Sequence, residues 1–219
     1  MVIHIVILSS TVWVGCVSPH LLLEELGTPF ELQFVDRTVA AHKQPAYLKL
    51  NPNGSIPVLV DGPVVLYETA AICLHLADTH PQAQLAPALG SPERAHFYKW
   101  LAWMTNTVQA SLTLYFYPDR WVNEGNAAGA AEVKAHAEAK VGTLLDQMEA
   151  HLASHGKDWF FGERYSALDP YAFLMCRWTR GFGRPARSLP RLGKYLDRML
   201  ARPAVKRVFE KEKLPVPYV

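Results

Sequence analysis

Two short stretches between residues 51 and 69 carry residue types that could bind a small charged ligand. The stretch NPNGSIPVLVDG, residues 51–62, reads as a turn followed by a strand, with Pro57 where the strand opens. Proline has no N–H to donate to a ladder, so it belongs at an edge or a bend. The pattern fits an ordinary trans proline at a strand start. It also fits a cis bond that turns the chain so that Ile56 presents its N–H and C=O to an extended partner.

The second stretch is the pair Glu68–Thr69, which opens an apolar helical pattern. The Glu68 carboxylate could pair with an ammonium group. Thr69 offers a hydroxyl, and its backbone N–H lies at a helix start, where an anion is stabilised. Simple capping of the helix by these two residues explains the same pattern, so both interpretations stand at this point.

The elements that must position these residues alternate between strand and helix. Strands are expected at 2–8, 31–36, 56–60 and 64–67, and helices at 19–26 and 68–80, with a helical turn at 46–50. The order β-α-β followed by β-β-α predicts a small α/β domain at residues 1–80.

The rest of the chain is predicted to be all-helical. Pro81, Pro87 and Gly90 punctuate a linker at about 81–91. Beyond it, residues 132–153 place apolar side chains on one helical face, and Ser166–Asp169 has the form of a capping box with Asp in place of Glu. We therefore expect a second domain of helices at residues 92–219.

The composition excludes several classes of protein. The net charge of +2 in 219 residues, with both signs mixed, does not suggest a nucleic-acid binder. Cys16, Cys73 and Cys176 are far apart in the sequence and do not have the spacing of metal ligands. We therefore expect no metal site, and we expect the three thiols to be reduced, as in a cytoplasmic protein. The apolar segments at 1–10 and 101–117 fit neither a signal peptide nor a membrane span.

The stretch NPNGSIPVLVDGPVVLYETAAICLHLAD resembles the glutathione-binding core of the glutathione transferases. The Trp159–Gly162 segment and the Ser166–Asp169 box resemble that family's C-terminal helical motif. YSALDPYAFLMCRW and PHLLLEELGTPFE look especially like the bacterial beta class. The resemblance covers nearly the whole chain. It implies a thioredoxin-like βαβ-ββα domain followed by a helical bundle domain.

The resemblance also implies roles for the residues introduced above. Ile56 and Pro57 would hold the cysteinyl backbone of glutathione, and Glu68 and Thr69 would hold its γ-glutamyl end. Lys43 would reach the glycine carboxylate, as would Arg37 or His42, although solvated surface charge explains these three equally well. Glutathione would be a co-substrate.

The family's thiol-activating residue is not in its standard place. Aligned without gaps on Gly27, the family's Ser position falls on Trp13, its beta-class Cys position on Gly15 and its Tyr position on Ser10. The candidates are therefore Ser10 and Thr11, with Ser9 beside them, and Cys16. Cys16 could instead form a mixed disulfide with glutathione, or simply pack as a small apolar residue. The resemblance gives no counterpart to the beta-class histidine of the first long helix, and Gln109 stands at its approximate place.

A pocket for the second substrate is expected against the first long helix. Its candidate residues are Trp13, Trp103, Asn106, Thr107 and Tyr115. Aromatic residues at helical spacing are more often core than pocket, so these side chains have two interpretations.

The expected activity is conjugation of the glutathione thiolate to a hydrophobic electrophile by a cytoplasmic homodimer. Two alternatives remain: a glutathione-dependent thiol–disulfide or peroxide reductase that uses Cys16, and a non-catalytic binding protein with the transferase fold. Isomerase and dehalogenase chemistries also occur on this scaffold.

Overall fold

A computed structural model describes residues 3–8, 17–36 and 38–219, with the backbone alone at 6–8. The chain divides into two compact units, Met1–Pro87 with Met199–Tyr218, and Ala88–Arg198 with Val219. The predicted boundary lies at 81–91, and the predicted second domain extends to residue 219. By their contacts, residues 199–218 group with the first unit, and each unit is described by itself below.

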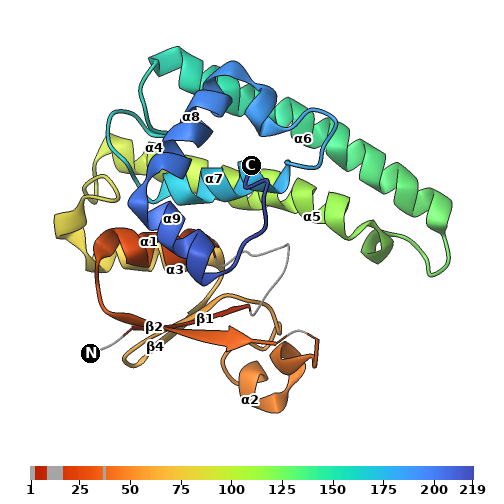
Figure 1. Cartoon of the computed structure of the whole chain (residues 1–219), viewed down its shortest axis with the longest axis horizontal. Coiled ribbons are helices and arrows are strands. Elements are labelled where there is room, and N and C mark those ends of the chain that lie inside the picture. Colours follow the sequence, from red (N-terminus) through yellow and green to blue (C-terminus); the bar gives the residue numbers. More distant parts are fainter. Residues whose placement is uncertain (1–2, 9–16, 37) are drawn as a thin grey trace. The chain divides into compact units, whose positions relative to one another are not determined.

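The first unit is built on a four-stranded sheet with the order β2-β1-β3-β4. Strand β1 (Ile3–Leu8) pairs parallel with β2 (Phe30–Val35) and antiparallel with β3 (Val58–Asp61), which pairs antiparallel with β4 (Val64–Tyr67). The parallel pair is joined through helix α1 (Val17–Leu26), as a parallel connection requires. This mixed sheet with its helices confirms the thioredoxin-like βαβ-ββα prediction (Figure 1).

Both faces of the sheet are covered. Side-chain alternation places Ile3, Ile5 and Leu59 on the face covered by α1 and by α3 (Thr69–Thr79), and all three are buried. On the other face, Val58 forms a smaller core with Val35 and Tyr47, beside the short helix α2 (Pro45–Leu48). The core thus fixes β3 at the centre of the sheet and the segment before it at the sheet's end.

Several element boundaries lie one or two residues from the predicted ones, among them those of β2, α2 and α3. The third strand was expected at 56–60, and the structure places it at Val58–Asp61. Pro57 has no N–H to donate, so the ladder opens at Val58, and it extends to the pair Asp61↔Val64 at the turn. Helix α1 begins at Val17, two residues before the expected start, and ends where Gly27 (φ +63°) donates its N–H to the carbonyl of Leu23 at 3.1 Å.

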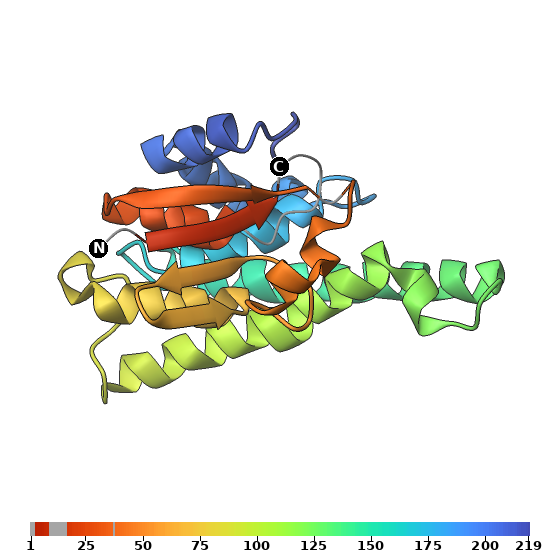
Figure 2. The same cartoon turned by 90° about the horizontal axis from the view of Figure 1, so that it is seen from below.

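The second unit is helical, which confirms the predicted fold class. Helix α4 (Pro92–Trp103), a π-helical segment (Met104–Gln109) and α5 (Ala110–Phe116) form one continuous helix (Figure 2). Helix α6 (Ala127–His155) and α7 (Leu168–Trp178) follow. Helix α8 (Pro190–Ala201) begins in this unit, and α9 (Pro203–Lys211) belongs to the first. Short 3₁₀ turns at 41–43, 81–83, 118–121 and 186–188 complete the description.

The predicted capping box at the start of α7 is confirmed. The Ser166 N–H donates to Oδ2 of Asp169 at 2.7 Å, and the hydroxyl of Ser166 accepts the N–H of Leu168 at 3.3 Å. Asp169 also accepts the N–H of Phe160 on its other oxygen, at 2.8 Å. The carboxyl group is fully buried, and this burial raises the pKa of Asp169 to about 6 against the lowering effect of its hydrogen bonds.

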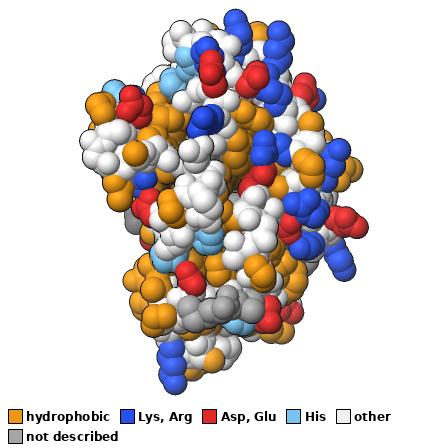
Figure 3. All heavy atoms as spheres, turned by 90° about the vertical axis from the view of Figure 1, so that its left-hand side faces the viewer, with side chains coloured by type: hydrophobic (Ala, Val, Ile, Leu, Met, Phe, Trp, Pro, Cys, Tyr) orange, Lys and Arg blue, Asp and Glu red, His pale blue; other side chains and the backbone are white. Residues whose placement is uncertain are grey.

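The surface carries both signs of charge. On the face shown in Figure 3, the coloured Arg, Lys, Asp and Glu side chains are interspersed among hydrophobic ones rather than gathered into a field of one sign. In the described part of the chain, no helix is both long and apolar enough to span a bilayer.

Candidate functional site

The hairpin of β3 and β4 brings the two sequence motifs together. Val58 pairs with Tyr67 at the open end of this ladder. Ile56 and Pro57 directly precede β3, and Glu68 and Thr69 directly follow β4. Both pairs therefore leave the same end of this hairpin and make up one candidate site.

The Ile56–Pro57 peptide bond is cis, as the sequence analysis required for ligand binding. Pro57 is buried and Ile56 is half-buried. Among residues 3–8, 17–36 and 38–219, no backbone hydrogen bond reaches the N–H or C=O of Ile56, because the ladder opens at Val58. This main-chain pair can hydrogen-bond to an extended ligand, as an added strand would.

The loop before Ile56 is held by a buried asparagine. Asn51 is fully buried, and its Nδ2 donates to the carbonyl oxygen of Ser55 at 2.7 Å. Its Oδ1 accepts the N–H of Asn53 at 3.0 Å, and the Tyr47 hydroxyl donates to the same Ser55 carbonyl at 2.6 Å. The Ser55 carbonyl oxygen thus accepts two hydrogen bonds, which fix the peptide that leads into Ile56.

Lys43 lies against this loop. Its Nζ donates to the carbonyl oxygen of Asn53 at 3.3 Å. Gly54 has φ +57°, and a Cβ built there would come within 2.8 Å of Lys43 Nζ and 2.9 Å of the His42 carbonyl oxygen. Glycine is required at position 54 for both reasons. The ammonium of Lys43 is thus anchored beside the segment that precedes Ile56.

Glu68 and Thr69 open helix α3 in different environments. Glu68 has φ +72°, an unusual conformation for a residue other than glycine, and its side chain is exposed. No described residue forms an ion pair or hydrogen bond with its carboxylate, whereas its carbonyl accepts the Ile72 N–H at 3.0 Å. Thr69 is buried to 7% exposure, and the first-turn amides around it form the positive end of α3. A ligand carrying an ammonium and a carboxylate fits this pair.

The predicted thiol-activating residues Ser10, Thr11 and Cys16 lie outside the described residues, as does Trp13. Helix α1 begins at Val17, the residue that follows Cys16 in the sequence. The other two cysteines are fully buried, and burial raises the pKa of both thiols, that of Cys176 to about 12. Neither has the lowered pKa of a reactive thiol.

The predicted pocket residues of the helical unit fall into separate places along one helix. Trp103 packs edge-to-face on Trp100, with ring centroids 5.3 Å apart. The ring centroids of Tyr115 and Phe182 are 4.2 Å apart. The Lys134 Nζ lies 4.9 Å from the Tyr115 ring centroid. At about 1.5 Å per residue, Trp103 and Tyr115 are about 18 Å apart along the helix. The structure therefore brings Trp103 and Tyr115 into two clusters rather than one.

Asn106 and Thr107 lie between them in the π-helical segment, with Asn106 exposed and Thr107 half-buried. The segment is tied to α7 because the Tyr171 hydroxyl donates a hydrogen bond to Oε1 of Gln109. π-helical turns are frequent at functional sites.

A separate open groove of about 610 Å³ lies between α5 and α6. It is lined by Ser111, Leu114, Trp121, Val122, Gly129, Glu132, Val133, His136, Ala137 and Lys140. Of the predicted pocket residues that the structure describes, Trp103, Asn106, Thr107 and Tyr115, none lines this groove.

Sequence reasoning missed three positions that support the site. Asn51 and Tyr47 hold the loop, and a signal for Asn51 was available, since Asn before a Pro-x-Gly turn often binds the backbone two residues on. His75 of α3 lies 2.8 Å from Asp61 at the hairpin turn, which links the helix to β3. No local pattern indicated that pair.

Comparisons with known proteins show the family of this chain. Residues 16–79 match the family model described as glutathione S-transferase, N-terminal domain, and residues 117–212 match glutathione S-transferase, C-terminal domain. Glutathione S-transferase GST-4.5 of Xanthomonas campestris pv. campestris is 32% identical over 197 residues, covering 89% of this chain and 93% of the relative. Glutathione S-transferase 3 of Zea mays is 33% identical over 204 residues, covering 90% and 89%.

Solved structures give the same likeness. The glutathione S-transferase from Xylella fastidiosa superposes with a TM-score of 0.84 at 28% identity, covering 97% of this chain and 100% of that one. A sphingomonad glutathione S-transferase complexed with glutathione superposes with a TM-score of 0.79 at 29% identity, covering 98% of this chain and 100% of that one.

Proposed function

This chain belongs to the glutathione S-transferase family, and on that premise we propose that it conjugates the glutathione thiolate to a hydrophobic electrophile. The observation that supports the proposal is the pairing of Val58 with Tyr67 at the end of the β3–β4 hairpin, from which Ile56–Pro57 and Glu68–Thr69 both leave. Residues 1–80 would bind glutathione, and residues 92–219 would bind the second substrate.

Each charged end of glutathione has a suited group in the first unit. The exposed Glu68 carboxylate would pair with the γ-glutamyl ammonium, a charge-assisted hydrogen bond. The Thr69 hydroxyl and the first-turn amides of α3 would hold the neighbouring carboxylate. The N–H and C=O of Ile56 would bond the cysteinyl unit, and Lys43 would reach toward the glycine carboxylate.

The reaction needs only a positioned thiolate. Bound glutathione would lose its thiol proton to water, assisted by a hydrogen-bond donor among Ser10, Thr11 and Cys16 and by the positive end of α1. The sulfur would form a bond to the electrophilic carbon, and a leaving group such as chloride would depart with the bonding electrons. Positioning and thiolate stabilisation supply the rate, with no covalent enzyme intermediate.

For the second substrate we keep Trp13, Trp103, Asn106, Thr107 and Tyr115 as candidates. The separation of Trp103 and Tyr115 along the helix favours Trp103, Asn106 and Thr107 as one group. We also propose that the protein is a cytoplasmic homodimer; the free thiols of Cys73 and Cys176 fit the reducing compartment alone. Light scattering at micromolar concentration checks the dimer.

Calorimetric titration with glutathione, followed by a turnover assay with a chloronitrobenzene acceptor, tests the proposal. Binding with a Kd below 1 mM, roughly −4 kcal/mol, together with conjugate formation, supports it. Binding without any conjugation, combined with disulfide exchange that Cys16→Ser abolishes, would support the reductase instead. A protein that neither binds glutathione nor forms conjugate would be a non-catalytic member of the fold.

A further inference from the structure

The π-helical segment Met104–Gln109 interrupts the long helix that α4 and α5 form. A π turn closes its hydrogen bond one residue later than an α turn, is rare, and occurs frequently at functional sites. If the segment closed to regular α-helix, the residues on one side of it would turn by about 100° relative to the other side, the rotation of one residue. The π turn therefore determines which side chains of this helix share a face.

Hydroxyl groups of the helix itself stabilise the irregular turn. Three of them donate to the carbonyl oxygen four residues back, those of Thr105, Ser111 and Thr113, at 2.9, 2.8 and 2.9 Å. Two of the accepting carbonyls, of Thr107 and Gln109, belong to the π segment. Such bonds bend a helix and supply donors where its main-chain pattern is disturbed. The local sequence thus tolerates the π turn.

Tyr171 of α7 supplies the support from outside this helix. Its side chain is only 1% exposed, and its hydroxyl donates to Oε1 of Gln109, the last residue of the segment. Oγ1 of Thr105 lies 3.4 Å from the same hydroxyl oxygen. Because a buried tyrosine hydroxyl is costly without a partner, the contact favours the one turn geometry in which both residues reach Tyr171.

The face that the π turn presents carries Trp103, Asn106 and Thr107. Asn106 and Thr107 follow Trp103 by three and four residues, a spacing that makes helical side chains neighbours. Asn106 is exposed, and no residue in the described part of the chain hydrogen-bonds to its carboxamide. A carboxamide offers two N–H donors, and the neighbouring indole packs against flat rings. This face suits an aromatic ligand that carries a hydrogen-bond acceptor.

We propose that Tyr171 is a positioning residue for the second substrate, which through Gln109 and Thr105 fixes the π turn so that Asn106 donates to an acceptor group of an aromatic electrophile. Nitro and carbonyl groups are acceptors of this kind. The inference rests on the proposed function and deepens it, because it names the class of electrophile.

The test compares Tyr171→Phe, Gln109→Met, the double variant and Asn106→Ala with the wild type. At saturating glutathione, kcat/KM is measured for para-nitrobenzyl chloride and for benzyl chloride, which lacks the acceptor group. The nitro group also changes the reactivity of the carbon, but this electronic effect is the same for every variant and cancels when the ratios of the two kcat/KM values are compared. Amide hydrogen exchange of residues 104–110 follows the turn without ligand or turnover.

Tyr195→Phe is the matched control in the same unit. The Tyr195 side chain is fully buried, and its hydroxyl donates to the carbonyl oxygen of Asp169 on α7 at 2.8 Å. The variant therefore removes one buried tyrosine hydroxyl from the same helix and leaves the bond between Tyr171 and Gln109 in place.

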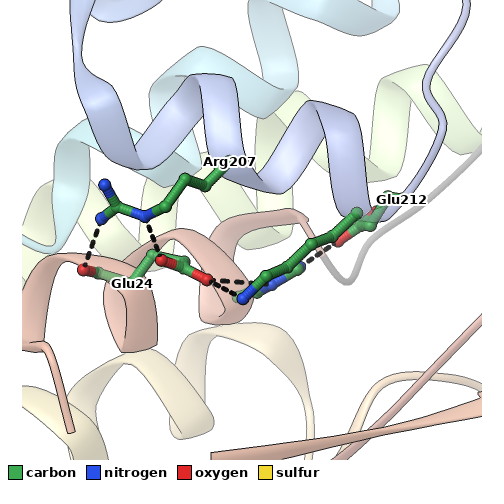
Figure 4. A network of polar contacts seen from close by, with 5 residues as sticks. Glu24, Arg207 and Glu212 are labelled. Carbon is green, nitrogen blue, oxygen red and sulfur yellow. Dashed lines mark hydrogen bonds and ion pairs between the residues drawn. The ribbon is translucent and has the colours of Figure 1, made fainter.

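A second control lies in the first unit, in a polar network between α1 and α9 (Figure 4). Glu24 accepts hydrogen bonds from Arg207 and Lys211 and lies 3.9 Å from His20, whose other ring nitrogen lies 2.7 Å from Glu212. Arg207→Ala removes one contact of this network and none of the helical unit. It separates a general loss of stability from a loss of discrimination between the two chlorides.

For Tyr171→Phe and Asn106→Ala we expect the ratio, nitro over unsubstituted, to fall about 2- to 12-fold, the range for one neutral hydrogen bond. Gln109→Met should lower it similarly, and the double variant should fall no further than Tyr171→Phe, because the two residues act as one pair. Exchange in residues 104–110 should be faster in Tyr171→Phe and Gln109→Met and unchanged in Asn106→Ala. Glutathione affinity, measured by calorimetry, should not change in these four variants, and both controls should keep the wild-type ratio.

Three outcomes would overturn the inference. If the wild type conjugates both chlorides and Tyr171→Phe keeps its ratio, the positioning role is wrong and the proposed function stands. An equal fall of the ratio in Tyr195→Phe would show a general effect of loosening α7. A wild type that conjugates neither chloride removes the proposed function and the positioning role together. If Tyr171→Phe does not fold, the ratio and the exchange of Gln109→Met decide.

Discussion

The side-chain amide of Asn51 donates a hydrogen bond to the carbonyl oxygen of Ser55 at 2.7 Å, on the residue that precedes Ile56. Asn51→Ala removes this bond and the one from the Asn53 N–H to Asn51 Oδ1. We expect a loss of about 1–3 kcal/mol of unfolding free energy, because buried partners are left unsatisfied. Glutathione affinity should fall as well, since the loop positions the Ile56 main chain. Urea denaturation and calorimetry measure the two effects, and an unchanged Kd would show that the loop does not organise the site.

Glu68→Gln should weaken glutathione binding with little effect on stability. The exposed carboxylate has no described partner to lose, whereas a charge-assisted bond to an ammonium contributes about 1.5–3 kcal/mol. We expect Kd to rise about 10- to 150-fold. Glu31→Gln, at a carboxylate that is 62% exposed on β2, is the matched control and should leave Kd unchanged. Equal affinities of Glu68→Gln and wild type would remove Glu68 from the site.

Asp169 should make the helical unit less stable as the pH rises from about 4 to about 6. Its folded pKa of about 6 lies above the ordinary value of 3.8, so the folded state binds the extra proton in that range. The stabilising contribution is complete below pH 3.8 and is lost as the pH passes 6. A shift of this size corresponds to about 3 kcal/mol.

Asp169→Asn should remove that dependence while lowering stability overall, because an amide NH₂ cannot accept the Ser166 N–H. Five of the six tryptophans lie in the helical unit, so tryptophan fluorescence in urea at several pH values follows its unfolding. Asp158→Asn, at an aspartate that is 71% exposed, is the control. The same pH slope in wild type and Asp169→Asn would contradict the raised pKa.

Native-state labelling should modify neither Cys73 nor Cys176. Both side chains are fully or nearly fully buried, at 0% and 1% exposure, and burial raises both thiol pKa values. Iodoacetamide at pH 8, followed by peptide mass spectrometry, should therefore label Cys16 alone if it labels any cysteine, and all three in urea. Label on Cys73 in the native protein would mean that α3 opens readily.

The sequence alone determined the element order, the fold class and the pairing of Pro57 with Glu68 in one motif. These follow from local rules, because apolar periodicity, turn residues and a missing N–H act over a few neighbouring positions. The resemblance then gave the ligand, since Ile56, Pro57, Glu68 and Thr69 stand in a recognisable register. The start of the third strand was wrong by two residues, because the proline that opens the motif does not join the ladder.

Only the tertiary structure decided which distant residues support that motif. The clamp of Asn51 and Tyr47 on Ser55 and the bond between His75 and Asp61 depend on how loops and helices fold back. The pairing of His20 with Glu212 spans 192 positions, and no periodic pattern along the chain connects residues so far apart. The local sequence determines the secondary structure of each segment. Which polar groups are buried against each other between segments depends on how the segments pack in the tertiary structure.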